Sequence, residues 1–191
     1  YGTALHQQVE DYLLEGTMPP DERLAPALKH LPPKLSGTTP GVLVETWLTA
    51  SFGFTGFKGR GDIIDVRDPS HPRILDLKTT GNMRYALTPK KLQSDVQMGC
   101  YAYCVMAERP TVDVVTVAHI YVSTKGPTQS KLVSAEITRE QANAVWAKVG
   151  HTAREMVLAY EEEWRQAVSP NVKECYAFGK ACPNIKMCAD V

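Results

Sequence analysis

Two predicted strands joined by a short polar turn constrain this chain more than any other feature. They have the sequences FTGFKGRGDIIDV, residues 54–66, and RILDLK, residues 73–78. The turn lies within residues 68–72, because prolines fix φ and the aspartate and serine hydrogen-bond to nearby backbone. Along the second strand side chains alternate, so Asp76 and Lys78 share one face and the leucines beside them point to the other. We therefore predict a polar site above an apolar core.

Asp62 lies on the first of these strands, where Gly59 and Gly61 leave open space around the backbone. Carboxylates from adjacent strands can hold a hard divalent cation, so Asp62 and Asp76 are candidate metal ligands. Lys78 can stabilise charge on a water or a phosphate beside that cation. Taken alone, an aspartate and a lysine at this spacing more often form an exposed polar strand face with a surface ion pair.

Four short motifs follow one another in order along the chain. They are His6, the G-x-x-D motif at residues 59–62, the D-x-K motif at residues 76–78 and the Q-x-x-x-Y motif at residues 97–101. With these motifs the chain resembles the PD-(D/E)XK nuclease superfamily, specifically its RecB-like exonuclease branch. That branch includes nuclease domains of helicase–nucleases, phage exonucleases and CRISPR-associated RecB-like enzymes. By motif, the resemblance covers residues 2–104.

The resemblance implies a metal-dependent deoxyribonuclease, an exonuclease that hydrolyses phosphodiester bonds in DNA recombination and repair or in phage DNA processing. It implies that Mg²⁺ or Mn²⁺ is held by His6, Asp62, Asp76 and the backbone carbonyl of Leu77. It also implies a catalytic set made of Asp62, Asp76, Lys78, Gln97 and Tyr101. The DNA would be single-stranded or a duplex end, and a helicase or recombination protein is an expected partner.

Two other functions are compatible with the same residues. One is a sequence- or structure-specific endonuclease of the same fold, and the other is a non-cleaving scaffold that binds nucleic acid. The histidine and the Q-x-x-x-Y motif favour the exonuclease branch. The intact Asp62, Asp76 and Lys78 argue against a scaffold, which has no physical need for them.

The periodicity of apolar residues predicts an α/β fold. A helix is expected over residues 3–15, ended by Gly16, followed by an antiparallel meander of three strands within residues 42–80. Three further elements are one long helix from Thr88-Pro89 to Arg109-Pro110, a buried central strand over residues 112–123 and a strand over residues 131–137. The order αβββαβ predicts a mixed central sheet flanked by helices, the restriction-endonuclease-like core of the superfamily.

The end of the chain is expected to pack on the same domain. A long helix begins with a capping box at residues 138–141 and continues to about Ala167. We predict a nuclease domain over residues 1–170 and a cysteine-containing tail over residues 171–191.

Charge gives no general sign of a nucleic-acid partner. Lysine and arginine number 21, as do aspartate and glutamate, so the net charge is zero. A binding surface must then come from local clusters. The candidates for phosphate contact and base stacking are Arg84, Tyr85, Lys90 and Lys91. Glu45, on the first strand of the meander, is either an additional acidic group or a solvated strand position.

The chain has five cysteines, an odd number that cannot all form disulfide pairs within it. Three of them lie close together near its end, at Cys175, Cys182 and Cys188. Some RecB-like nucleases bind a [4Fe–4S] cluster through one upstream cysteine and three near the C-terminus, which implies the same for these three. No cysteine precedes Cys100, so the fourth ligand lies before Tyr1, is another residue, or no cluster forms. Zinc would also need four ligands.

No apolar run approaches the roughly 18 residues of a membrane-spanning helix, and no signal peptide is visible. The cysteine pattern does not look like a disulfide framework of a secreted protein. We therefore expect an intracellular, cytoplasmic protein in a bacterial or phage-infected cell.

Overall fold

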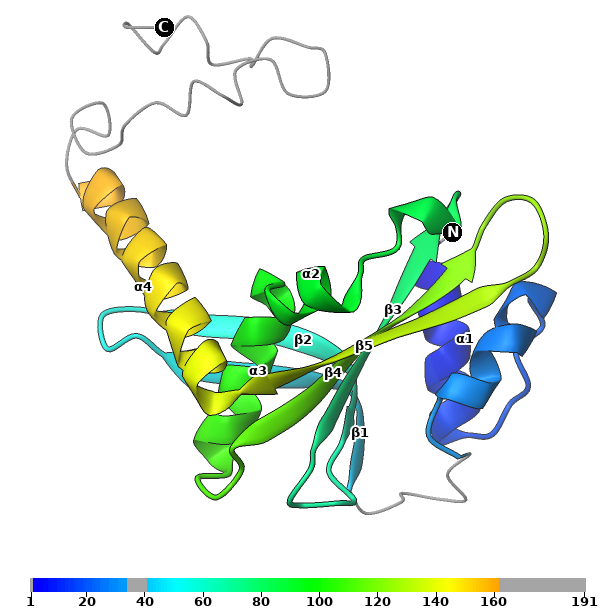
Figure 1. Cartoon of the computed structure of the whole chain (residues 1–191), viewed down its shortest axis with the longest axis horizontal. Helices are drawn as coiled ribbons and strands as arrows, with labels where there is room; N and C mark the ends of the chain where they lie inside the picture. The colour runs from blue at the N-terminus through cyan, green and yellow to red at the C-terminus, as the bar shows by residue number, and fades with distance from the viewer. Residues whose placement is uncertain (1, 34–40, 162–191) are drawn as a thin grey trace, which may run out of the picture. The chain divides into compact units, whose positions relative to one another are not determined.

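The computed structural model describes residues 2–33 and 41–161. Before the sheet come α1 (Gly2–Leu14) and the 3-10 helix η1 (Glu22–His30). The strands of the meander are β1 (Val42–Ser51), β2 (Gly56–Asp65) and β3 (Arg73–Thr80). The remaining elements are η2 (Met83–Tyr85), α2 (Pro89–Gln93), α3 (Val96–Glu108), β4 (Val114–Ser123), β5 (Ser130–Thr138) and α4 (Arg139–Glu161). The expected order of helix, three strands, helix and strand is confirmed (Figure 1).

Within the described residues the strands form a mixed five-stranded sheet in the order β1-β2-β3-β4-β5. Only β3 and β4 pair in parallel, and the other neighbours are antiparallel. A parallel pair needs a long crossover, which the segment with α2 and α3 provides. The predicted α/β class, with a mixed sheet and flanking helices, is confirmed.

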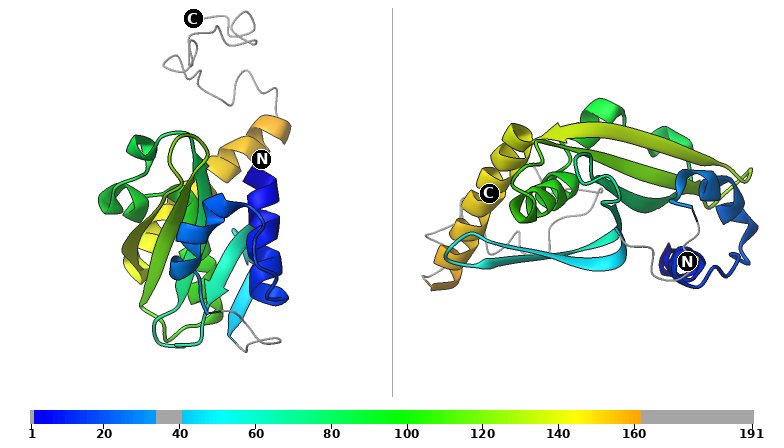
Figure 2. Two further views of the ribbon diagram at one scale, coloured as in Figure 1. Left: turned by 90° about the vertical axis from the view of Figure 1, so that its right-hand side faces the viewer. Right: turned by 90° about the horizontal axis from the view of Figure 1, so that it is seen from below.

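Two apolar clusters cover the two faces of this sheet. The helix α1, in dark blue, and the helix α3, in green, lie on opposite sides of the sheet (Figure 2). On one face Leu5, Val9 and Leu13 of α1 pack against Leu75 and Leu77 of β3. On the other face buried residues of α3 pack against Ile74 of β3 and Val117 of β4, among others. We call these the α1 side and the α3 side of the sheet. The leucines of β3 lie opposite to Ile74, as the alternation predicts.

The strands β2 and β3 pair over a short length only. Their register ends at Ile63↔Leu75, after Asp65↔Arg73 and Ile64↔Ile74. Beyond that point β2 continues along β1, down to Ser51↔Gly56, while β3 continues along β4. The β1–β2 hairpin therefore departs from the rest of the sheet (Figure 1). By the strand register, the departure begins next to Asp62.

The prediction of a single long helix after Thr88 is wrong, because the structure has two helices there. α2 ends at Gln93 and α3 begins at Val96. The Asp95 carboxylate accepts a hydrogen bond from the Met98 amide at 3.0 Å and thereby starts a new helix. Aspartate competes for backbone donors in this way, which the apolar periodicity does not register.

The chain falls into two compact units, residues 1–147 and 148–191. Of the second unit, the structure describes the continuation of α4 to Glu161. The predicted boundary at residue 170 lies outside the described residues. Of the helices in the described ranges, none is both long and apolar enough to cross a membrane.

Candidate active site

Four of the predicted catalytic side chains meet on the α3 side of the sheet. Lys78 Nζ lies 2.8 Å from Asp76 Oδ2 and donates to Gln97 Oε1 at 3.1 Å. The Gln97 amide nitrogen lies 3.2 Å from both Asp76 Oδ1 and the Tyr101 hydroxyl. β3 therefore presents the aspartate and the lysine on one face, and the first turns of α3 hold both in position.

A close contact between α3 and β2 completes this arrangement. The Tyr101 hydroxyl donates to the Arg60 backbone carbonyl at 2.8 Å. A Cβ on Gly59 would lie 2.5 Å from the Tyr101 ring, so no other residue fits there without displacing the ring. The expectation of open space around Gly59 is wrong, because the tyrosine of the Q-x-x-x-Y motif fills it.

Asp76 is buried, with 3% of its surface exposed. Burial and the nearby Asp62 raise the pKa of Asp76 to about 6, although Lys78 opposes this shift. Burial lowers the pKa of Lys78, but its hydrogen bond and charge interaction with Asp76 outweigh burial, so the pKa is raised overall. The charged form of Asp76 is therefore costly to keep, while the charged form of Lys78 is stabilised by its contact with Asp76.

Both oxygens of Asp76 have a partner in the site. Oδ1 accepts from the Gln97 amide, and the buried Oδ2 lies 2.8 Å from Lys78 Nζ. Among the described residues, Lys78 is the single partner of Oδ2. A divalent cation bound to Oδ2 would therefore share or displace the contact with Lys78.

His6, Glu45 and Asp62 meet on the α1 side of the site. Their ligand atoms lie within 4.8 Å of one another, which is compatible with a shared metal ion. His6 Nδ1 is 3.3 Å from Asp62 Oδ2 and 3.9 Å from Glu45 Oε1. The hydrogen bond to Asp62 raises the pKa of His6, against the effect of burial. α1 thus brings its histidine to the same carboxylate that the G-x-x-D motif predicts as a metal ligand.

Asp62 joins the two sides of the site. Its Oδ2 accepts a hydrogen bond from the Leu77 amide at 2.7 Å, just beyond the last paired residues of β2 and β3. This contact places Asp62 next to the backbone of the D-x-K motif. Among the described residues, the ligand atoms close enough to share a cation are those of His6, Glu45 and Asp62. Asp76 and the Leu77 carbonyl stay predicted ligands.

Glu45 lies beside His6 and Asp62, although its sequence position was compatible with either an acidic group of the site or a solvated strand position. Its side chain is 15% exposed, so it is not a solvated strand position. Burial and the charge of Asp62 raise its pKa, and Arg60 Nε lies 2.8 Å from Oε2. Its backbone φ is +49°, a conformation rare for a residue with a side chain.

This unusual φ changes which face of the sheet the β1 side chains point to. Val44 packs in the cluster on the α1 side, but Leu48, four residues later, packs on the α3 side. Strict alternation would put both on one face. The register is interrupted at Glu45, between Val44↔Ile63 and Thr46↔Gly61. No pattern in the sequence signals such a reversal.

His119 is a second residue near the site that the sequence did not indicate. It is the cross-strand partner of Asp76 and is 3% exposed. The Tyr121 hydroxyl accepts from the Leu87 amide at 3.1 Å and lies 3.1 Å from His119 Nδ1. Because the Tyr121 oxygen already accepts from Leu87, its hydroxyl proton is assigned as donated to His119 Nδ1. The ring proton of the neutral His119 imidazole then lies on Nε2.

Burial, and then the charge of Lys78, lower the pKa of His119 to about 4. Nε2 is buried without a hydrogen-bond partner among the described residues. His119 is therefore a neutral imidazole beside the buried carboxylate of Asp76.

The predicted nucleic-acid contacts lie on the segment between β3 and α3. Arg84, Tyr85, Lys90 and Lys91 are exposed on η2 and α2, and Tyr85 is 80% exposed. In the described part of the chain, none of their side chains pairs with a site residue. Their role in binding stays a prediction.

The cysteines divide into two groups. Cys175, Cys182 and Cys188 lie outside the described residues. Cys100 and Cys104 are buried on α3, and burial raises the pKa of Cys104 to about 12. A thiol with such a pKa is a poor metal ligand and a poor nucleophile.

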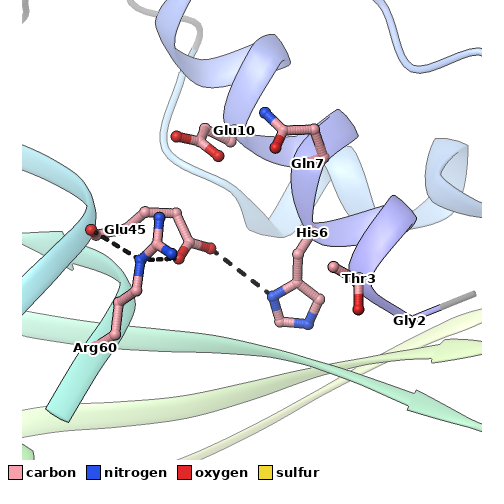
Figure 3. A pocket seen from close by; sticks show the side chains of 7 residues that line it. All are labelled: Gly2, Thr3, His6, Gln7, Glu10, Glu45 and Arg60. Atoms are coloured by element: carbon pink, nitrogen blue, oxygen red, sulfur yellow. Dashed lines mark hydrogen bonds and ion pairs between the residues drawn. The ribbon is translucent and has the colours of Figure 1, made fainter.

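An open pocket of about 360 Å³ lies next to this site on the α1 side (Figure 3). Its wall is formed by α1 and the β1–β2 hairpin, through Gly2, Thr3, His6, Gln7, Glu10, Glu45 and Arg60. Figure 3 shows the Arg60 side chain lying against Glu45 and the His6 ring directed towards it. The α1 side therefore has room for a ligand beside the candidate metal residues.

A comparison with models of known protein families finds one match. Residues 21–189 match the family model described as "PD-(D/E)XK nuclease superfamily". None of the curated proteins matches the sequence. Among solved structures, "Crystal structure of SSO0001" is 16% identical and has a TM-score of 0.45, covering 95% of this chain and 68% of that chain.

Proposed function

Because this chain belongs to the PD-(D/E)XK nuclease superfamily, we propose that it is a RecB-like, divalent-metal-dependent deoxyribonuclease that acts as an exonuclease. The observation that supports this most is the buried Asp76, whose Oδ2 lies 2.8 Å from Lys78 Nζ and whose pKa is raised by burial and by the nearby Asp62. A buried carboxylate with a raised pKa and a nearby lysine is typical of a catalytic site.

The proposed metal ligands are His6, Asp62, Asp76 and the Leu77 carbonyl. An imidazole together with carboxylates suits Mn²⁺ somewhat better than an all-oxygen site does, and Mg²⁺ suits the carboxylates. When bound, the cation lowers the pKa of a water molecule and neutralises charge on the scissile phosphate. To become a ligand through Nδ1, His6 must give up the proton that it now shares with Asp62.

The remaining residues position and stabilise the reacting groups. Lys78 is the only cation that contacts Asp76 directly within the described residues, and it can orient the attacking water or stabilise charge that develops on the phosphate. Gln97 holds Asp76 and Lys78 at their mutual distance, and Tyr101 fastens Gln97 to β2. We propose DNA recombination and repair, or phage DNA processing, as the setting, with a helicase or recombination protein as partner.

One experiment tests the activity and separates the exonuclease from the endonuclease. Purified protein is incubated with linear and circular DNA, single-stranded and duplex, labelled at either end, with Mg²⁺, with Mn²⁺ or with a chelator. We expect metal-dependent release of short products from linear DNA only, and none from the Asp76→Ala variant. Cleavage of circular DNA would instead identify an endonuclease, and no cleavage of any substrate would leave a binding scaffold.

We also propose that Cys175, Cys182 and Cys188 bind a metal centre, either a [4Fe–4S] cluster or zinc. Three close cysteines in a tail cannot all pair with one another as disulfides. Elemental analysis of protein purified without oxygen should find iron with sulfide, or zinc, and substitution of any of the three should remove it. Protein without iron or zinc would leave these cysteines as reduced thiols.

A further inference from the structure

An aromatic side chain and two cations occupy one face of the β1–β2 hairpin. Trp47 pairs across the strands with Arg60, and Thr49 pairs with Lys58. Residues directly opposite one another in an antiparallel pair point to the same face. Trp47 is 55% exposed, and Lys58 Nζ lies 4.0 Å from the centroid of its ring. The Arg60 guanidinium lies 5.9 Å from the same ring.

This face is continuous with the candidate metal site. Arg60 is two residues before Asp62 on β2, forms an ion pair with Glu45 and lines the pocket that contains His6 (Figure 3). Lys58 lies two residues before Arg60 on the same strand, farther from Asp62. Steps of two residues in a strand measure about 7 Å, so the cations are spaced at intervals comparable with the length of a nucleotide in an extended chain.

The opposite face of the hairpin is anchored, which makes this face a firm support. Gly59 lies against Tyr101, and Leu48 belongs to the apolar cluster on the α3 side. At the tip, the Phe52 ring stacks on Trp146 with a centroid distance of 4.0 Å. The outward face, by contrast, is exposed at Trp47, Thr49, Ser51, Gly56, Lys58 and Arg60.

The charges of this face fit a polyanion. Within the described residues Lys58 has no carboxylate partner, and the contact that the structure shows for it is with the Trp47 ring. Arg60, in contrast, is paired with Glu45. An exposed indole beside a lysine that has no carboxylate partner is a combination on which single-stranded nucleic acid binds, with bases stacked on the ring and phosphates next to the cation. In a duplex the faces of the bases are covered by their neighbours and cannot stack on a side chain.

We propose that the outward face of the β1–β2 hairpin binds the single-stranded part of a DNA substrate next to the scissile phosphate. Trp47 stacks on a base, Lys58 contacts a phosphate, and Arg60 contacts the phosphate nearest the metal residues. This inference rests on the proposed nuclease function for the identity of the ligand. It assigns to the site a preference for single strands, or for duplexes with a single-stranded end.

Binding tests the inference independently of cleavage. Fluorescence anisotropy of a labelled oligothymidylate and of a duplex of equal length is measured with Lys78→Ala protein, which keeps both carboxylates. Adding Trp47→Ala should raise the Kd for the single strand by about tenfold or more, because stacking on one aromatic residue has roughly that value. Lys58→Ala should lower the slope of log Kd against log salt concentration by about 0.7, as one lost phosphate contact does for single strands.

Two control variants change similar residues elsewhere. Tyr160→Ala removes an aromatic side chain that is 91% exposed on α4, and Lys131→Ala removes an exposed strand lysine on β5. Both should change the Kd for the single strand by less than about twofold. Circular dichroism of all variants checks that the fold is retained.

The outcomes separate the two proposals. If the unmodified protein cleaves DNA but Trp47→Ala binds the single strand normally, the hairpin face is not the binding surface. Equal loss of affinity for the single strand and the duplex would overturn the preference for single strands. If the unmodified protein cleaves no DNA, the proposed nuclease activity fails, while loss of binding in Trp47→Ala would still support the surface.

Discussion

The two sides of the candidate site differ in how tightly their side chains are held. On the α3 side, Asp76, Lys78 and Gln97 form a closed network in which Asp76 is almost fully buried. On the α1 side, His6 is 31% exposed and faces an open pocket together with Glu45. The difference indicates a division of tasks: the α3 side is organised before any ligand arrives, and the α1 side can rearrange around a metal and a substrate.

The largest expected effect comes from breaking the α3 side. Asp76→Ala and Lys78→Ala should each lower the rate of DNA cleavage at least about a hundredfold, because each removes a charge next to the reacting phosphate. Lys78→Arg should fail as well, since a planar guanidinium cannot replace a compact ammonium. Single-turnover kinetics with Mn²⁺ measures the loss. Near-normal turnover by any of the three would disprove the catalytic assignment.

A smaller effect should follow from weakening the α1 side. His6→Ala should reduce the affinity for Mn²⁺ by about ten- to a hundredfold, since one ligand is lost while the carboxylates remain. Excess Mn²⁺ should restore part of the activity, which it cannot do for Lys78→Ala. Free Mn²⁺ is measured by electron paramagnetic resonance, with Gln7→Ala as the control from the same helix. An unchanged Mn²⁺ titration would make His6 an ordinary helix residue.

The pH dependence of stability tests whether the α3 side is as buried as the structure indicates. The pKa of His119 is lowered to about 4, so between pH 6.5 and 4 the unfolded chain binds a proton that the folded one does not. His119 therefore contributes stability above pH 6.5, and this contribution is lost as the pH falls towards 4. The loss amounts to roughly 3 kcal/mol.

Chemical denaturation of His119→Phe and of the unmodified protein measures this contribution. The variant should gain stability relative to the unmodified protein as the pH falls from 6.5 to 4. Asp76 acts in the opposite direction, because its raised pKa makes the folded chain the stronger proton binder between its ordinary pKa and about 6. Because both proteins contain Asp76, its contribution to the pH dependence cancels in the difference between their free energies of unfolding. A difference that does not change with pH would show that His119 titrates normally.

The smallest effect concerns the contact that ties the α3 side to the hairpin. Tyr101→Phe keeps the ring that fills the space at Gly59 but removes the hydroxyl, which donates to the Arg60 carbonyl and accepts from Gln97. We expect a loss of about 2 kcal/mol in the free energy of unfolding, the value of two such bonds, with a modest loss of activity. Urea titration measures it. If Tyr101→Phe lowered activity as much as Asp76→Ala does, Tyr101 would have a direct part in the reaction.

The sequence by itself determined the parts of this protein that depend on local rules. Alternation along residues 73–78 placed Asp76 and Lys78 on one face, and the turn at residues 68–72 made the two strands neighbours. The spacing of four residues brought Gln97 and Tyr101 to one side of a helix. Periodicity, turn chemistry and motif order act over a few residues, so a sequence is enough to reveal them.

Tertiary structure decided the features that depend on which strands pair and on which face of the sheet their side chains lie. The left-handed Glu45 reverses the faces of β1, which puts this carboxylate beside Asp62 and turns Trp47 outward. The parallel pairing of β3 with β4 puts His119 next to Asp76, although 42 residues lie between them in the chain. Neither result follows from local pattern, because a backbone reversal and a pairing register are chosen by the packing of both faces of the sheet at once.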